Sequence, residues 1–98
     1  MAIELTLEER AIADDVVAAV ALTLSVDPDD IMTRWRKAEV VRARDFCIYI
    51  LRNDYHWKLR VIQEYFKIQS HSSVMYCVTR GTNQLRKDKK LSLQYNHI

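Results

Sequence analysis

The feature that most constrains this chain is how little in it can interrupt a helix. Its 98 residues contain a single glycine and a single proline, the two residue types that most often break helices and mark turns. Apolar residues recur at spacings of three and four rather than two, which is the period of an amphipathic helix. The sequence therefore predicts an all-α fold, a small helical domain.

The length and composition indicate one domain. A chain of 98 residues can build one modest core, so we treat residues 1–98 as a single domain. The longest uninterrupted apolar stretch, 16–22, is far shorter than a membrane span. The first ten residues are acidic where a targeting peptide would be basic, so we expect no cleaved leader, no membrane association and a cytoplasmic location.

The two cysteines give a second indication of the compartment. Cys47 and Cys77 stand 30 positions apart within apolar helical patterns. We expect free buried thiols rather than a disulfide or a metal pair. This expectation agrees with a reducing environment.

Capping residues place the first two helices. Thr6 and Glu9 have the spacing of a capping box, and an apolar stripe continues from there to about Ser25. Asp27 followed by Pro28 is typical of an N-cap and first helical residue, which predicts a short helix through 32. The stripe of the first helix consists of Ile12, Val16, Ala19, Val20 and Leu24.

Three further helices follow, and the last two form a helix-turn-helix pattern. The apolar spacing predicts a long central core helix over 38–53 and a short helix over 59–66. A tight turn at 67–69 leads to Ser70 as the N-cap of a final helix, so the helix-turn-helix covers about 59–88. Gly81 in the interior of this last helix costs about 1 kcal/mol relative to alanine unless close packing offsets it.

Charge is strongly segregated along the chain. Residues 1–33 hold one basic and eight acidic residues, a formal charge of −7, whereas the other 14 basic and 5 acidic residues give 34–98 a charge of +9. Such segregation is typical of a protein with a polyanionic partner. The alternative is that acidic and basic helices pack side by side and largely cancel.

Small polar residues at the start of the final helix indicate what that partner is. Segment 69–75 places hydroxyl groups and the His71 imidazole where a helix N-terminus meets phosphates and bases. Two basic segments, 34–37 and 42–44, lie upstream at distances that let all three converge on one duplex. The pattern predicts a small module that binds double-stranded DNA.

Residues from about 18 to 85 resemble the C-terminal DNA-binding domain of the bacterial replication initiator DnaA family, a helix-turn-helix related to the Trp repressor group. The register holds without gaps from Arg36 onward. The family's recognition helix opens with Gly-Gly-Arg-Asp-His-Thr-Thr-Val. The equivalent stretch here, 67–74, is Lys-Ile-Gln-Ser-His-Ser-Ser-Val.

The resemblance implies roles for individual residues. Arg36 matches the arginine of the basic loop that enters the minor groove, Arg44 a contact arginine early in the long helix, and Arg80 a basic residue of the recognition helix. We expect four arginines to contact mainly phosphates: Arg42, Arg44, Arg60 and Arg80. The full set of candidate DNA-binding residues is Arg36, Lys37, Arg42, Arg44, Leu59, Arg60, Gln69, Ser70, His71, Ser72, Ser73, Tyr76 and Arg80.

Several departures from the family pattern limit what can be carried over. Gln69 and Ser70 replace an Arg-Asp pair of which the Asp reads a base, and Asp45 replaces a glutamine near the DNA backbone. Ser72 and Ser73 keep hydroxyls but lack the threonine methyls that pack on thymine. The preferred DNA sequence of the family is therefore not expected to transfer unchanged.

The sequence thus predicts a monomeric, nucleoid-associated module that binds double-stranded DNA without a cofactor or metal. An alternative is a protein adaptor whose helix-turn-helix has drifted, with Asp45 and the acidic first helix facing a protein partner. We do not expect an enzyme, because the sequence offers no nucleophile with a plausible base, no metal-ligand cluster and no glycine-rich phosphate loop.

Overall fold

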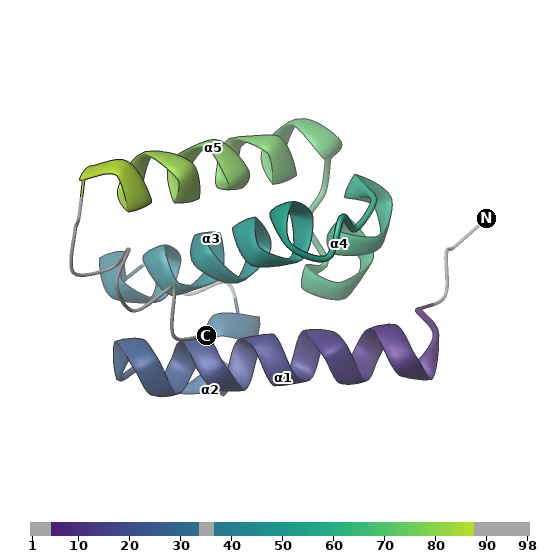
Figure 1. Ribbon diagram of the computed structural model, residues 1–98, viewed down its shortest axis with the longest axis horizontal. Helices are drawn as coiled ribbons and strands as arrows, with labels where there is room; N and C mark the ends of the chain where they lie inside the picture. Colours follow the sequence, from purple (N-terminus) through teal and green to yellow (C-terminus); the bar gives the residue numbers. More distant parts are fainter. Residues whose placement is uncertain (1–4, 34–36, 88–98) are drawn as a thin grey trace.

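The computed structural model describes residues 5–33 and 37–87. Over these ranges the chain forms α1 (Leu7–Leu24), α2 (Pro28–Met32), α3 (Ala38–Asn53), α4 (Leu59–Phe66) and α5 (His71–Lys87), without any strand (Figure 1). The all-α prediction is confirmed. The predicted helix bounds agree with the observed ones to within about one residue.

Helix α3 is the centre of the molecule. It lies between α1 on one side and α5 on the other, and both neighbours run antiparallel to it (Figure 1). Helix α4 lies at the end of α3, next to the start of α5, and α2 contacts both α1 and α3. The prediction of a central core helix over 38–53 is therefore confirmed.

The capping box predicted for α1 and the N-cap predicted for α2 are both present. Thr6 Oγ1 accepts a hydrogen bond from the Glu9 amide at 3.0 Å, and Glu9 Oε1 accepts one from the Thr6 amide at 3.0 Å. Asp27 Oδ1 accepts from the Asp29 amide at 2.9 Å at the start of α2. These bonds satisfy amides that have no partner within their own helix.

The buried face of α1 is rotated relative to the predicted stripe. Val16 and Val20 are buried as expected, but Ile12, Ala19 and Leu24 are only half-buried. The remaining buried positions are Ala13, Val17 and Ala21. These buried positions of α1 belong to the same core as the buried residues of α3. Two of them are alanines, whose short side chains let the two helices pack closely.

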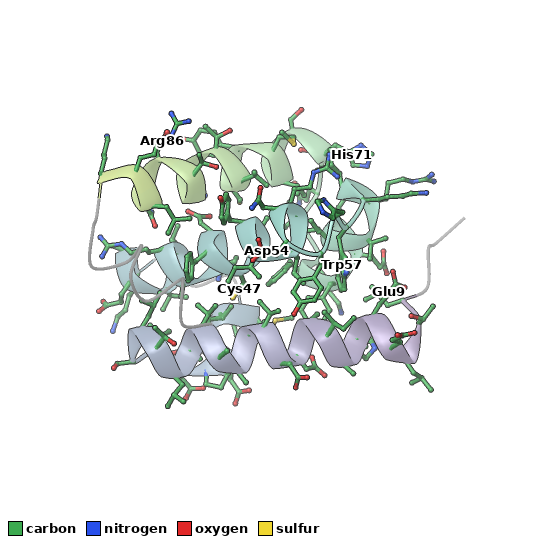
Figure 2. All side chains as sticks on the ribbon, viewed as in Figure 1. Glu9, Cys47, Asp54, Trp57, His71 and Arg86 are labelled. Carbon is green, nitrogen blue, oxygen red and sulfur yellow. The ribbon has the colours of Figure 1, made fainter. Side chains whose placement is uncertain are left out.

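The turn before α4 is an integral part of the core. Trp57 is 8% exposed and belongs to the hydrophobic cluster (Figure 2), and its carbonyl accepts a hydrogen bond from Arg52 Nη1 at 2.8 Å. His56 adopts a left-handed backbone, with φ of 56°. Tyr65 then joins α4 to α1 by donating its hydroxyl to Asp14 Oδ1 at 2.5 Å, and burial together with this bond raises the pKa of the phenol.

Both cysteines are free and buried, as predicted. Cys47 lies on α3, on the side that faces α1 (Figure 2). Among the helices described, none is long and apolar enough to cross a membrane.

Gly81 marks the closest approach of α5 to α3. A Cβ atom added at this position would lie 2.9 Å from Tyr49 Cβ and 3.0 Å from the Asp45 carbonyl oxygen. Neither of these atoms is the end of a flexible side chain, so neither can move without moving α3. Close packing therefore accounts for a glycine in the middle of a helix.

We expect Gly81→Ala to lower the free energy of unfolding by about 1–2 kcal/mol, since overpacking outweighs the gain of about 1 kcal/mol in helix propensity. Asn83→Ala, at an exposed position of the same helix, is the control and should stabilise by about 0.5 kcal/mol. Urea denaturation measures both variants. A Gly81→Ala protein as stable as the wild type would show that the helices do not meet closely here.

Candidate nucleic-acid interface

The connection between α4 and α5 is a tight helix-turn-helix corner. Lys67 ends α4 in the left-handed conformation, with φ of 55°, and its amide donates to the Gln63 carbonyl. The Ile68 amide donates to the same carbonyl at 3.0 Å. Ser70 then caps α5 by accepting from the Ser73 amide at 3.2 Å through its Oγ, so the predicted N-cap is confirmed.

The first turn of α5 presents polar side chains outward while its apolar positions are buried. His71, Ser72 and Ser73 are exposed, and Val74 is fully buried. Figure 2 shows His71 at the α4 end of α5 and Arg86 near the opposite end. The amides of a helix N-terminus and the exposed imidazole and hydroxyls together form a surface that donates hydrogen bonds to an anion.

The hydroxyls of this turn are not equivalent. Ser70 Oγ lies 3.0 Å from Ser73 Oγ, so these two hydroxyls share a hydrogen bond within the cap. Ser72 is exposed between His71 and Ser73. The cap therefore stabilises the turn that carries the His71 and Ser72 side chains.

Beyond the first turn, the exposed face of α5 continues along one side of the helix. Val74, Cys77 and Gly81 face the core, and the opposite side carries exposed Met75, Tyr76, Thr79 and Asn83. Thr79 Oγ1 donates to the Met75 carbonyl at 3.0 Å, so its hydroxyl hydrogen is used within the helix. Tyr76 is 62% exposed and is the largest side chain on this face.

The structure distributes the other candidate residues over three elements. Lys37 and Arg42 are exposed at the start of α3, and Arg60 is exposed on α4. Gln69 is exposed in the turn, whereas Leu59 is half-buried against the core. Arg36, to which the resemblance assigns the minor groove, lies outside the residues that the structure describes.

Arg44 joins helices within the protein. Its Nε donates to the Ile31 carbonyl at 2.9 Å and its Nη2 to the Thr33 carbonyl, so it fastens α3 to the end of α2. Burial lowers the pKa of this guanidinium. Arg44 also lines a cavity of about 350 Å³ together with Thr33, Lys67, Gln69 and Ser73, which brings it next to the helix-turn-helix corner.

Arg80 is paired with a carboxylate from α3. Its Nη2 donates to Asp45 Oδ1 at 3.1 Å, and its Nε lies 3.1 Å from Asp45 Oδ2. Nη2 also approaches Cys77 Sγ at 3.6 Å, and the guanidinium carbon lies 4.6 Å from the centre of the Tyr76 ring. The edge formed by Nε and Nη2 and one face of the guanidinium are therefore occupied by groups of the protein.

The interpretation of Asp45 as a residue near the DNA backbone, or on a surface for a protein partner, is wrong. Asp45 is 1% exposed and lies between α3 and α5. Burial raises the pKa of its carboxyl group, and the charge of Arg80 partly opposes this effect. Val41 and Tyr49 lie one helical turn to either side of Asp45, a spacing compatible with burial, but no spacing along the chain indicates its partner on α5.

The described residues form no metal site, and their arrangement is that of a DNA-binding surface. Within 5–33 and 37–87, no three His, Cys, Asp or Glu side chains gather so as to hold a metal ion. The described ranges instead combine a capped, polar helix start with exposed cations on α3 and α4. This arrangement defines the class of helix-turn-helix DNA-binding modules.

Comparison with known proteins identifies the family. The helix-turn-helix of the bacterial dnaA protein matches residues 13–80. The chain belongs to this family, and it is a DNA-binding module of the DnaA type. The comparison with solved structures gave no match.

Curated relatives agree with this assignment. The chain is similar to the chromosomal replication initiator protein DnaA of Mycoplasma genitalium, at 37% identity over 76 residues that cover 78% of this chain and 17% of the relative. It is 37% identical over 76 residues to the protein of the same name from Mycoplasma pneumoniae, again covering 78% and 17%. The Deinococcus deserti DnaA is 35% identical over 78 residues, covering 80% and 17%. The chain thus spans less than a fifth of the length of these three relatives.

The buried carboxylate makes stability depend on pH in a specific direction. Because the pKa of Asp45 is raised above 3.8 in the folded protein, the native state holds more protons than the unfolded chain between these two values. The contribution of Asp45 to stability therefore falls as the pH rises through this window. We expect Asp45→Asn to be more stable than the wild type near neutral pH and to lose this advantage on acidification.

Glu39→Gln is the matched control for this experiment. It makes the same change of charge at an exposed position in the first turn of the same helix, where a carboxylate favours the helix dipole. It should be slightly less stable than the wild type at neutral pH. Thermal unfolding measures the stability of both variants between about pH 4 and pH 7, the range in which a carboxyl group of raised pKa titrates. An Asp45→Asn protein less stable than the wild type at neutral pH would contradict the assigned direction.

Proposed function

We propose that this module binds double-stranded DNA with the first turn of α5 in a major groove, while the basic segment before α3, including Arg36, reaches the adjacent minor groove. The observation that carries the proposal is the exposure of His71 and Ser72 on a helix start that Ser70 caps. Side chains of this kind at the N-terminus of a recognition helix can reach both base edges and phosphates.

Phosphate contacts come from exposed cations on either side of the corner. Lys37 and Arg42 at the start of α3 and Arg60 on α4 supply positive charge, and they fix the position of the module on the duplex without reading its sequence. Arg44 contributes mainly by fastening α3 to α2. The cavity that it lines opens beside Gln69 and Ser73, where a phosphate would meet both the corner and α3.

The wider role follows from the relatives. Because they are named chromosomal replication initiator proteins, we propose that this chain contributes DNA binding to the initiation of replication and is associated with the nucleoid. We further propose that it acts as a monomeric binding module, not as an enzyme, and needs no cofactor. The helix-turn-helix covering 59–88 within one domain of residues 1–98 is part of the same proposal.

The acidic α1 is a second candidate surface, for a protein partner. Its exposed residues include Glu8, Asp14 and Asp15, and Leu22 on the same helix is 85% exposed. Leu22 lines an apolar hollow of the surface with Ala18, Val26 and Pro28, and such a patch on an acidic helix favours contact with a basic partner that has an apolar patch of its own. Light scattering of the purified chain tests the monomer proposal, and a self-association that Leu22→Glu abolishes would overturn it.

Selection from a random-duplex library, followed by fluorescence anisotropy on the selected site and on an unrelated duplex, tests DNA binding directly. If about five phosphates are neutralised, the plot of log Kobs against log salt concentration should have a slope of about −4 to −5. A flat salt dependence, or no binding to either duplex, would contradict the proposed function.

Two substitutions separate base reading from phosphate contact. His71→Ala should cost about 1–3 kcal/mol of binding free energy on the selected site and little on the unrelated duplex. Arg42→Ala should weaken both complexes similarly and make the salt slope less negative by about 0.9. Equal losses on both duplexes for both variants would show that His71 reads no base.

A further inference from the structure

Arg80 lies on α5, only two and a half turns from its start, yet its charge is directed inward. Asp45 from α3 occupies the edge of the guanidinium formed by Nε and Nη2, with both N···O distances at 3.1 Å, and the Arg80 side chain is 38% exposed. Arg80, which the sequence suggested as a DNA contact, is thus paired with the buried Asp45 carboxylate.

The packing of the two helices makes this pair possible. At Gly81, the residue after Arg80, an added Cβ would lie 3.0 Å from the Asp45 carbonyl oxygen. The glycine therefore brings the backbone of α5 onto α3 at the position where Asp45 stands. The carboxylate reaches Arg80 directly because no side chain separates the helices at this point.

The pair also fixes an aromatic side chain. Tyr76 lies one helical turn before Arg80, and the guanidinium carbon lies 4.6 Å from the centre of its ring. Because Asp45 anchors one edge of the guanidinium, the plane on which the ring stacks is itself anchored. The ring remains 62% exposed, on the same face as Ser72, four residues earlier.

We propose that Asp45 is a positioning residue of the DNA interface: it withholds the Arg80 guanidinium from the phosphates and holds it against Tyr76, so that the second turn of α5 presents a fixed neutral ring in place of a mobile cation. This inference rests on the proposed DNA binding. Asp45 itself touches no DNA. Its effect is on specificity.

The effect has a definite sign. A phosphate contact by a lysine or arginine strengthens binding to all sequences. Neutralising that cation weakens binding to unrelated DNA, whereas a rigid ring beside the bases retains its contact with the preferred site. Asp45 therefore raises the ratio of specific to unspecific affinity while it lowers the total charge that the module offers to DNA.

Asp45→Asn tests the proposal in anisotropy titrations on the selected and unrelated duplexes. Release of Arg80 should strengthen binding to the unrelated duplex several-fold, steepen its salt slope by about 0.9 and lower the specificity ratio. Asp15→Asn makes the same substitution at an exposed position of α1, on the side of α3 away from α5 (Figure 1), and should leave the slope unchanged. Equal slopes for wild type and Asp45→Asn, or equal effects of the two variants, overturn the proposal.

The double variant Asp45→Asn/Arg80→Gln identifies the released cation. It removes both charges of the pair and so leaves no buried charge without its counter-charge, and it remains informative even if a single variant folds poorly. Its salt slope should equal that of the wild type. A slope less negative than the wild type by about 0.9 would show that Arg80 already contacts a phosphate, and would overturn the proposal.

NMR of the free protein separates this inference from DNA binding itself. The side-chain protons of Arg80 should show an upfield ring-current shift in the wild type and in Tyr76→Phe, and none in Tyr76→Leu. In Asp45→Asn the shift should collapse toward the Tyr76→Leu value. If the wild type binds no duplex, the proposed function is wrong, and so is the role of Asp45 in specificity. If the ring-current shift of Arg80 is unchanged in Asp45→Asn, only the role of Asp45 in positioning Arg80 is wrong.

Discussion

The arrangement of this protein depends on the close contact between α3 and α5 at Gly81. A single missing side chain lets the two helix backbones meet, with only 2.9 Å between an added Cβ and Tyr49 Cβ. The contact determines how α5 lies on the central helix, and hence which of its side chains point outward. Val74 and Cys77 are buried by it, and His71, Ser72 and Tyr76 remain exposed.

The basic residues fall into two groups with different physical roles. Lys37, Arg42 and Arg60 are exposed, and exposed cations are the kind that can displace condensed counterions from the phosphates of DNA. Arg44 and Arg80 instead hold neighbouring elements together, the first through the carbonyls of Ile31 and Thr33 and the second through a buried carboxylate. An arginine has enough donors to stabilise the scaffold from the edge of the interface, so a count of cations overstates the charge that DNA can meet.

Much of the fold could be predicted because it depends on local interactions. The capping pair Thr6 and Glu9 and the N-cap of Ser70 involve neighbours in the chain, and these caps together with the apolar periodicity located the helices. The resemblance to the DnaA family supplied the candidate interface residues, and the family match confirms the family itself. The roles of Asp45 and the partners of Arg80 could not be predicted, because they lie 35 residues apart and meet only through helix packing.

The sequence by itself therefore determined the five helices, their caps, the helix-turn-helix corner and the family, since each depends on short-range spacing or on a motif. Only the tertiary structure decided which charges remain available. Burial leaves Asp45 1% exposed and gives Arg80 a carboxylate partner, and no pattern of residue types specifies burial of a polar group by a distant helix. The physical reason is that the free energy of a charge depends on the dielectric surroundings and the partners that the fold supplies.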